Sequence, residues 1–173
     1  MRNLYLCFIT IFTMSVSSMI IDNLDDTRAN WSAISDNVMG GISEVNFYEL
    51  DDGSDKFYRL EGSVSTKNNG GFIQSVIRFP INAQDFQGIR FKVRGTSDDY
   101  YLWIRTPASR FPWDRYIASF QPEEDWSIIE IPFSSLKKSN FYMRGKMNTS
   151  KIRTIAFAAY GKDFQAQLDI ANI

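Results

Sequence analysis

The side chains that usually carry nucleophilic or metal chemistry are nearly missing from this 173-residue chain, which has no histidine and one cysteine, Cys7. Ser-His-Asp triads, Cys-His pairs and zinc sites built on imidazole or thiolate are therefore excluded. Carboxylate chemistry and an unusual Ser-Lys pair remain. The acidic clusters 51–55, 98–99 and 123–125 match no specific calcium loop, and nothing indicates that two of them meet across a cleft. Solvated turns are the simpler interpretation, with a structural calcium ion as the open alternative. We expect no enzyme activity, no cofactor and no metal site.

Charge and composition limit the partners. Nineteen basic residues against twenty acidic ones give a net charge of −1, which argues against a nucleic-acid partner because such proteins usually carry a basic excess. The 44% hydrophobic and 23% charged residues are typical of a globular protein. We therefore expect a folded globular domain without a nucleic-acid partner.

Two neighbouring segments, 89–94 and 101–105, alternate apolar residues with cationic or aromatic ones. In half-buried strands this pattern points Phe91 and Val93 inward and the cationic and aromatic residues outward. Segments joined by a short turn often pair. A shared cationic and aromatic face could then stack on sugar rings or hold an anionic group, although a solvated face is the alternative. The outward residues that we predict to bind are Arg90, Arg94, Trp103 and Arg105.

Two loops supply further candidates. Trp113, next to a proline between two strand-like segments, is predicted either to anchor a partner or to fold back and cap the core. The turn that contains Asp36, Gly40 and Gly41 is predicted either to line a ligand site or to be a tight turn. In the second case the glycines supply the backbone geometry and Asp36 caps backbone amides. Trp31 and Trp126 are expected in the core.

The N-terminal segment differs from the rest of the chain. Arg2 is followed by an apolar run and then by small residues, which is typical of a secretory signal peptide over residues 1–18. An uncleaved membrane anchor is the alternative, because the run approaches the length of a membrane span. After cleavage the domain of residues 19–173 has no cysteine and hence no disulfide bond. We expect an exported protein, in a bacterial periplasm.

The remaining sequence predicts an all-β fold. Strand-like alternation recurs along the chain, and Gly/Asn/Asp clusters separate the segments. No segment is typical of a long amphipathic helix. Many short strands with regular turns favour a jelly-roll β-sandwich of one domain.

Several motifs, in order along nearly the whole mature chain, resemble the complex I intermediate-associated protein 30 family. The most specific is the run Ser35–Ser43, which follows Trp31 and reads Ser-Asp-Asn-Val-Met-Gly-Gly-Ile-Ser. After Phe72 the family usually has an early arginine, whereas here five residues precede Arg78. The other matching segments are Asn69–Phe72, Val93–Gly95, Tyr100–Arg105, Tyr116–Phe120, Trp126–Phe133 and Ile152–Ile173.

This resemblance implies a galactose-binding-like jelly roll and a link to respiratory complex I assembly. It therefore predicts a non-catalytic assembly factor that binds a protein partner such as an assembly intermediate. Export would separate the domain from the cytoplasmic arm of bacterial complex I. The alternative is an exported carbohydrate-binding module that uses the cationic-aromatic face or a loop end. Membrane association through the N-terminal segment stays open as well.

Overall fold

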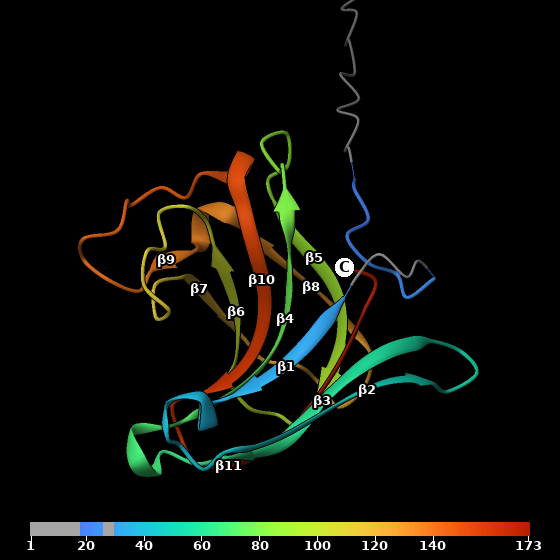
Figure 1. Ribbon diagram of the computed structural model, residues 1–173. Coiled ribbons are helices and arrows are strands. Elements are labelled where there is room, and N and C mark those ends of the chain that lie inside the picture. The colour runs from blue at the N-terminus through green and yellow to red at the C-terminus, as the bar shows by residue number, and fades with distance from the viewer. Residues whose placement is uncertain (1–17, 26–29) are drawn as a thin grey trace, which may run out of the picture.

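The computed structural model describes residues 18–25 and 30–173, which form two antiparallel sheets packed face to face (Figure 1). The predicted signal peptide or anchor lies almost wholly outside the described residues. Within them the helical elements are short 3-10 turns, namely η1 (Asp36–Met39), η2 (Lys67–Asn69), η3 (Phe133–Ser135) and η4 (Thr149–Lys151). The predicted all-β jelly-roll sandwich is confirmed. No helix in the described ranges is long and apolar enough to cross a membrane.

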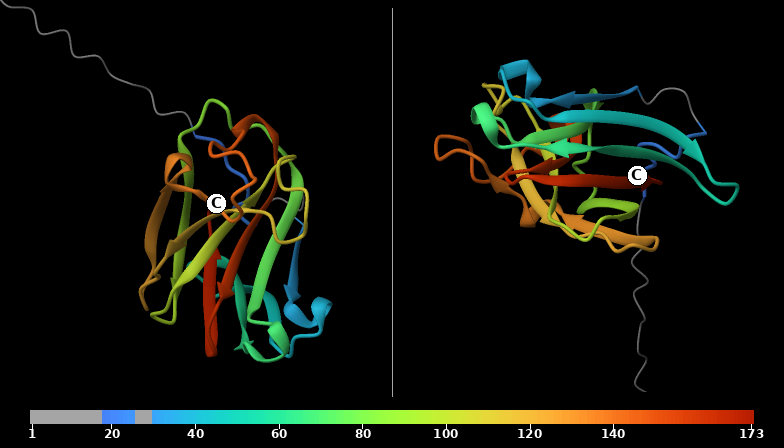
Figure 2. Two further views of the ribbon diagram at one scale, coloured as in Figure 1. Left: turned by 90° about the vertical axis from the view of Figure 1, so that its left-hand side faces the viewer. Right: turned by 90° about the horizontal axis from the view of Figure 1, so that it is seen from below.

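The two sheets have the strand orders β1-β4-β10-β6-β7-β9 and β2-β3-β11-β5-β8. The six-stranded sheet consists of β1 (Trp31–Ser35), β4 (Phe72–Ile81), β10 (Ile152–Tyr160), β6 (Tyr100–Arg105), β7 (Tyr116–Phe120) and β9 (Lys137–Lys138). The five-stranded sheet consists of β2 (Glu44–Asp51), β3 (Lys56–Val64), β11 (Phe164–Ala171), β5 (Gly88–Gly95) and β8 (Ser127–Pro132). The two layers are visible from the side and from below (Figure 2).

One hydrophobic core fills the space between the sheets. Phe91 is fully buried, and its ring centroid lies 4.8 Å from that of Phe157 on the opposite sheet. Val93 is also fully buried, so the predicted inward direction of both residues is confirmed. Trp31 packs partly against this core, and its indole Nε1 donates a hydrogen bond to Asp22. Trp126 instead packs in a smaller cluster with Phe57, at a centroid distance of 5.5 Å.

The expected pairing of segments 89–94 and 101–105 is wrong. β5 pairs with β11 and β8, whereas β6 pairs with β10 and β7 in the other sheet. The connection between them crosses from one sheet to the other, because the apolar sides of β5 and β6 close the same core from opposite directions. Arg90 and Arg94 therefore lie on one outer face of the sandwich, and Trp103 and Arg105 lie on the opposite one.

Candidate binding surfaces

The glycine-rich turn after β1 is held by the buried carboxylate of Asp36. This carboxylate accepts hydrogen bonds from the backbone N–H groups of Ser43 at 2.9 Å and Phe72 at 3.2 Å, and from that of Gly71. Burial raises the pKa of Asp36, but the hydrogen bonds from Gly71, Ser43 and Phe72 outweigh it and leave the pKa below its ordinary value. One ionised side chain thus joins the turn to the start of β4.

The glycines of this turn, and Gly70 beside it, are required by space and by backbone geometry. Gly40 has φ of 90°, in the left-handed region that favours glycine. A Cβ atom on Gly41 would lie 2.3 Å from the Asp36 carboxylate, and one on Gly70 would lie 2.4 Å from it. The geometry agrees with the tight-turn interpretation, in which Asp36 caps backbone amides. In this arrangement Asp36 has no accessible surface for a ligand.

The same turn presents apolar side chains to solvent. Val38 is 75% exposed and Met39 is 61% exposed, and Ile42 is exposed beside them. We call these three residues the apolar tip. The Asp36 hydrogen bonds hold the backbone beneath the apolar tip.

The outer side of the six-stranded sheet is cationic and aromatic. Within the described strands β1, β4, β10, β6 and β7, none of the outward positions carries an aspartate or a glutamate. We call this surface the six-strand face. Its cationic and aromatic members include Arg78, Arg105, Arg115, Phe72, Tyr101, Trp103 and Tyr160.

Arg115 lies flat on this surface. Its guanidinium carbon is 3.7 Å from the ring centroid of Trp103 and 5.4 Å from that of Tyr160. Arg115 Nε and Trp103 Nε1 are both buried without a hydrogen-bond partner in the described part of the chain. Burial lowers the pKa of the Arg115 guanidinium. Trp103 is only 3% exposed, so Arg115 and Tyr160, rather than Trp103 itself, meet the solvent here.

Arg105 shares the face with Trp103, as predicted, but its head group supports a loop. Its Nη2 donates to the backbone carbonyl of Phe111 at 2.8 Å, and its Nε donates to that of Asp114 at 3.1 Å. Burial lowers the pKa of Arg105. Arg105 therefore positions the β6–β7 loop at the edge of the six-strand face.

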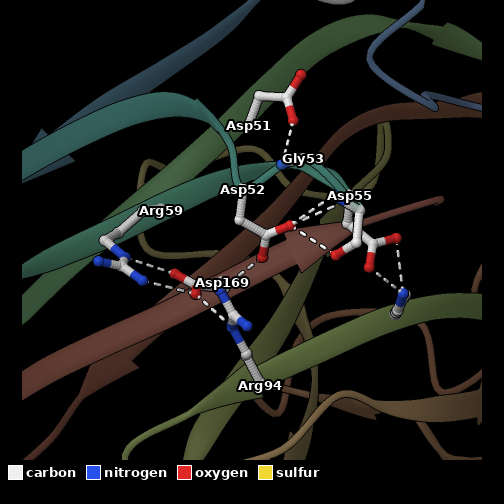
Figure 3. Close-up of polar contacts among 9 residues, drawn as sticks. Asp51, Asp52, Gly53, Asp55, Arg59, Arg94 and Asp169 are labelled. Carbon is white, nitrogen blue, oxygen red and sulfur yellow. Dashed lines mark hydrogen bonds and ion pairs between the residues drawn. The ribbon is translucent and has the colours of Figure 1, made fainter.

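The outer side of the five-stranded sheet, which we call the five-strand face, contains an ion network around Asp169 (Figure 3). Asp169 is fully buried and accepts two hydrogen bonds from Arg59, at 2.7 and 2.8 Å, and one from Arg94 at 2.8 Å. Asp169 raises the pKa of the Arg59 guanidinium. The Arg94 guanidinium carbon also lies 4.5 Å from the Trp126 ring centroid.

The β2–β3 hairpin extends this network. Asp52 lies 3.4 Å from Arg94, and Asp55 accepts from Lys92 Nζ at 2.6 Å (Figure 3). Arg90 lies apart from the network, in an exposed pair with Glu130. Arg94 is thus occupied by Asp169 and Asp52, a pairing that the alternation of residues along the strands does not predict. The one sequence signal for this pairing was Asp169, a carboxylate within the apolar strand 164–171.

Trp113 lies on the surface of the β6–β7 loop and does not cap the core. It is 54% exposed and stacks on Phe111, with ring centroids 5.2 Å apart and planes at 7°. Its Nε1 donates to the Tyr142 hydroxyl at 3.2 Å. The recognition role predicted for Trp113 stays a prediction.

Across the described ranges, no group of three or more Cys, Asp or Glu side chains is placed to hold a metal ion.

Comparison with known proteins identifies the family. The chain matches the family described as complex I intermediate-associated protein 30 over residues 22–170, and it belongs to that family. Its fold is that of the galactose-binding-like carbohydrate-binding modules. No curated protein matches the chain.

Solved structures share this fold at low sequence identity. A family 11 carbohydrate-binding module from Clostridium thermocellum, in complex with a β-1,3-1,4-mixed-linked tetrasaccharide, matches with a TM-score of 0.73 and 19% identity over 92% of this chain and 95% of that chain. A family 30 carbohydrate-binding module matches with a TM-score of 0.53 and 15% identity over 78% and 82% of the two chains. An exo-β-agarase matches with a TM-score of 0.60 and 11% identity over 90% of this chain and 24% of that one.

Proposed function

We propose that this protein is a non-catalytic binding domain that docks a partner protein through the apolar tip. The observation that carries the proposal is that Val38 and Met39 are exposed on a turn fixed by the buried Asp36. This turn belongs to the most specific motif of the family, whose description associates it with a complex I intermediate. An assembly intermediate of respiratory complex I is accordingly one partner class to test, and an envelope protein is the other.

Physical chemistry supports this use of the turn. Exposed apolar side chains gain free energy when a partner covers them. A rigid turn loses little conformational entropy on binding, because its backbone is already ordered. The Ser43 hydroxyl and the backbone N–H groups of Ser43, Gly71 and Phe72 hold the turn through Asp36, and the partner contacts the apolar tip.

A pull-down from native membranes tests the proposal. The double variant Val38→Ser with Met39→Gln should lose most of the recovered partner while its thermal melt stays close to that of the wild type. Ile128→Ser is the matched control, because Ile128 is also an exposed apolar residue but lies on the five-strand face. Full recovery by the double variant, or equal loss by the control, contradicts the proposal.

A second candidate function is glycan binding on the six-strand face. It is favoured by the arrangement of Arg115 over Trp103 and Tyr160, which offers aromatic rings and a cation to a sugar. The similarity in fold to carbohydrate-binding modules supports it as well. On this proposal Tyr160, rather than Trp103, makes the main stacking contact.

Affinity electrophoresis in gels that contain mixed-linkage β-1,3-1,4-glucan tests the second candidate. Tyr160→Ala should weaken retardation by about 1–2 kcal/mol of binding free energy. Tyr48→Ala is the control, because Tyr48 is similarly exposed on the five-strand face. Retardation that is absent in the wild type, or equally reduced in both variants, removes this candidate.

We also propose that the protein is exported. The apolar N-terminal segment with its small residues supports cleavage before Met19. N-terminal sequencing of protein from native cells should start near this residue, and a soluble cytoplasmic product that begins at Met1 contradicts it. Export favours an envelope protein or a glycan as partner, whereas a cytoplasmic product favours complex I assembly.

A further inference from the structure

A cavity of about 580 Å³ opens at the end of the sandwich that lies opposite the apolar tip. The β6–β7 loop, residues 106–115, forms one wall, and residues 142–151 of the segment between β9 and β10 form the other. These loops are the yellow and orange ones at the upper left of Figure 1. We call this space the end cavity.

The lining of the end cavity has a strong charge bias. It includes Arg110, Arg144, Lys146 and Lys151, and it includes no aspartate or glutamate. In the described part of the chain none of these four cations takes part in an ion pair. The whole chain has a net charge of −1, so this concentration of positive charge is local. Four cations along one lining, none of them in an ion pair with a described residue, attract an anionic ligand.

The end cavity also has aromatic walls. Phe111 comes from one loop and Tyr142 from the other, with ring centroids 6.1 Å apart and planes at 84°. The Tyr116 hydroxyl, at the base, donates to the backbone carbonyl of Arg144 at 3.0 Å. Aromatic walls with a few polar groups suit an organic ring more than a small inorganic ion.

A single buried carboxylate holds the two walls together. Asp114 accepts from the backbone N–H groups of Arg110 and Phe111, both at 3.0 Å. It also accepts from the Asn140 amide at 2.8 Å and from the Tyr142 hydroxyl on the other loop. Burial raises the pKa of Asp114, but these hydrogen bonds outweigh it and leave the pKa lowered. The end cavity is therefore ordered before any ligand arrives, which reduces the entropy lost on binding.

We propose that the end cavity binds an acidic saccharide, a sugar that carries carboxylate or sulfate groups. The four cations pair with its anionic groups, and Phe111 and Tyr142 contact its rings. Arg110 and Arg144 are suited to bidentate hydrogen bonds with carboxylate or sulfate oxygens. The end cavity is separate from the apolar tip and from the stacked rings of the six-strand face. The inference can therefore be tested independently of the proposed function.

Isothermal titration of the mature chain with polygalacturonate and heparin oligosaccharides tests the inference, with mixed-linkage glucan oligosaccharides as the neutral comparison. The wild type should bind at least one acidic oligosaccharide more tightly than the neutral one. The double variant Lys146→Gln with Lys151→Gln should weaken this binding by at least about tenfold, which is 1.4 kcal/mol. Arg90→Gln with Lys67→Gln removes the same charge elsewhere and should leave it unchanged.

Several results overturn the inference. Equal losses in the two double variants show that binding depends on net charge and not on the end cavity. No binding to any acidic oligosaccharide excludes the ligand class. Binding of inorganic phosphate or of phosphatidylglycerol vesicles that depends on Lys146 and Lys151, without saccharide binding, assigns the site to another anion. Tyr160→Ala and the Val38/Met39 variant should retain acidic-saccharide binding, which separates this test from those above.

Discussion

The two outer faces of the sandwich both carry arginines, but they satisfy them in different ways. On the five-strand face, Arg59 and Arg94 share the buried carboxylate of Asp169, and Lys92 pairs with Asp55 (Figure 3). On the six-strand face, Arg115 lies on aromatic rings and Arg105 donates to backbone carbonyls. No described outward strand position there supplies a carboxylate.

The paired cations of the five-strand face stabilise the fold, whereas the cations of the six-strand face have no carboxylate partner in the described part of the chain and are available to a ligand. A cation that already has a carboxylate gains little from an anionic ligand, because it must first give up its partner. A half-buried cation without a counter-charge keeps part of its desolvation penalty until a ligand offsets it. The six-strand face is therefore the better candidate for recognition, although both faces contain cations and aromatic rings.

The largest expected effect concerns Asp169. Asp169→Asn should destabilise the fold by about 3–5 kcal/mol, because it leaves the partly buried Arg59 without a counter-charge and Arg94 with only its longer pair to Asp52. Urea denaturation at pH 7 measures this. Glu130→Gln breaks the exposed pair with Arg90 and should cost less than about 0.5 kcal/mol. Similar urea midpoints for Asp169→Asn and Glu130→Gln would contradict the difference between the buried network and the exposed pair.

A smaller effect is expected for Lys92. A double-mutant cycle with Lys92→Met and Asp55→Asn should give a coupling free energy of about 1 kcal/mol, because both side chains are partly shielded from water. The coupling should decrease as the salt concentration rises. A coupling free energy of zero would contradict a stabilising ion pair between Lys92 and Asp55 of the β2–β3 hairpin.

Arg115 should behave differently from the paired cations. Arg115→Met should change the free energy of unfolding by less than about 1 kcal/mol in either direction, because the lost contact with Trp103 is offset by relief of desolvation. The measurement is again urea denaturation. A loss as large as that of Asp169→Asn would show that Arg115 is as structural as the paired arginines.

The smallest effect concerns acid sensitivity. The Ser54 hydroxyl, followed by the backbone amides of Asp55 and Ser54, lowers the pKa of Asp52 from 3.8 to about 2. A lowered pKa in the folded state means that the stabilisation is present above pH 3.8 and is lost as the pH falls towards 2. The stability difference between wild type and Asp52→Asn should disappear over this window. The difference between wild type and Arg115→Met should stay constant there, because Arg115 has no carboxylate partner.

Several features were predictable because they depend on nearby residues. The alternation of apolar and polar residues in 89–94 predicted that Phe91 and Val93 point inward, since successive side chains of a strand face opposite sides. The Gly/Asn/Asp clusters predicted turns, and the motif around Asp36 indicated the family. The capping role considered for Asp36 agrees with its hydrogen bonds.

The sequence by itself determined which side chains point into the core, because strand periodicity is a local property of the backbone. Only the tertiary structure decided which strands are neighbours, because pairing depends on how the apolar sides of distant segments close one core. Asp169 and Arg59 are 110 positions apart, yet they form a bidentate pair, whereas β5 and β6 are consecutive and lie in different sheets. The partner of each charged side chain, and hence its freedom to bind a ligand, follows from that long-range packing.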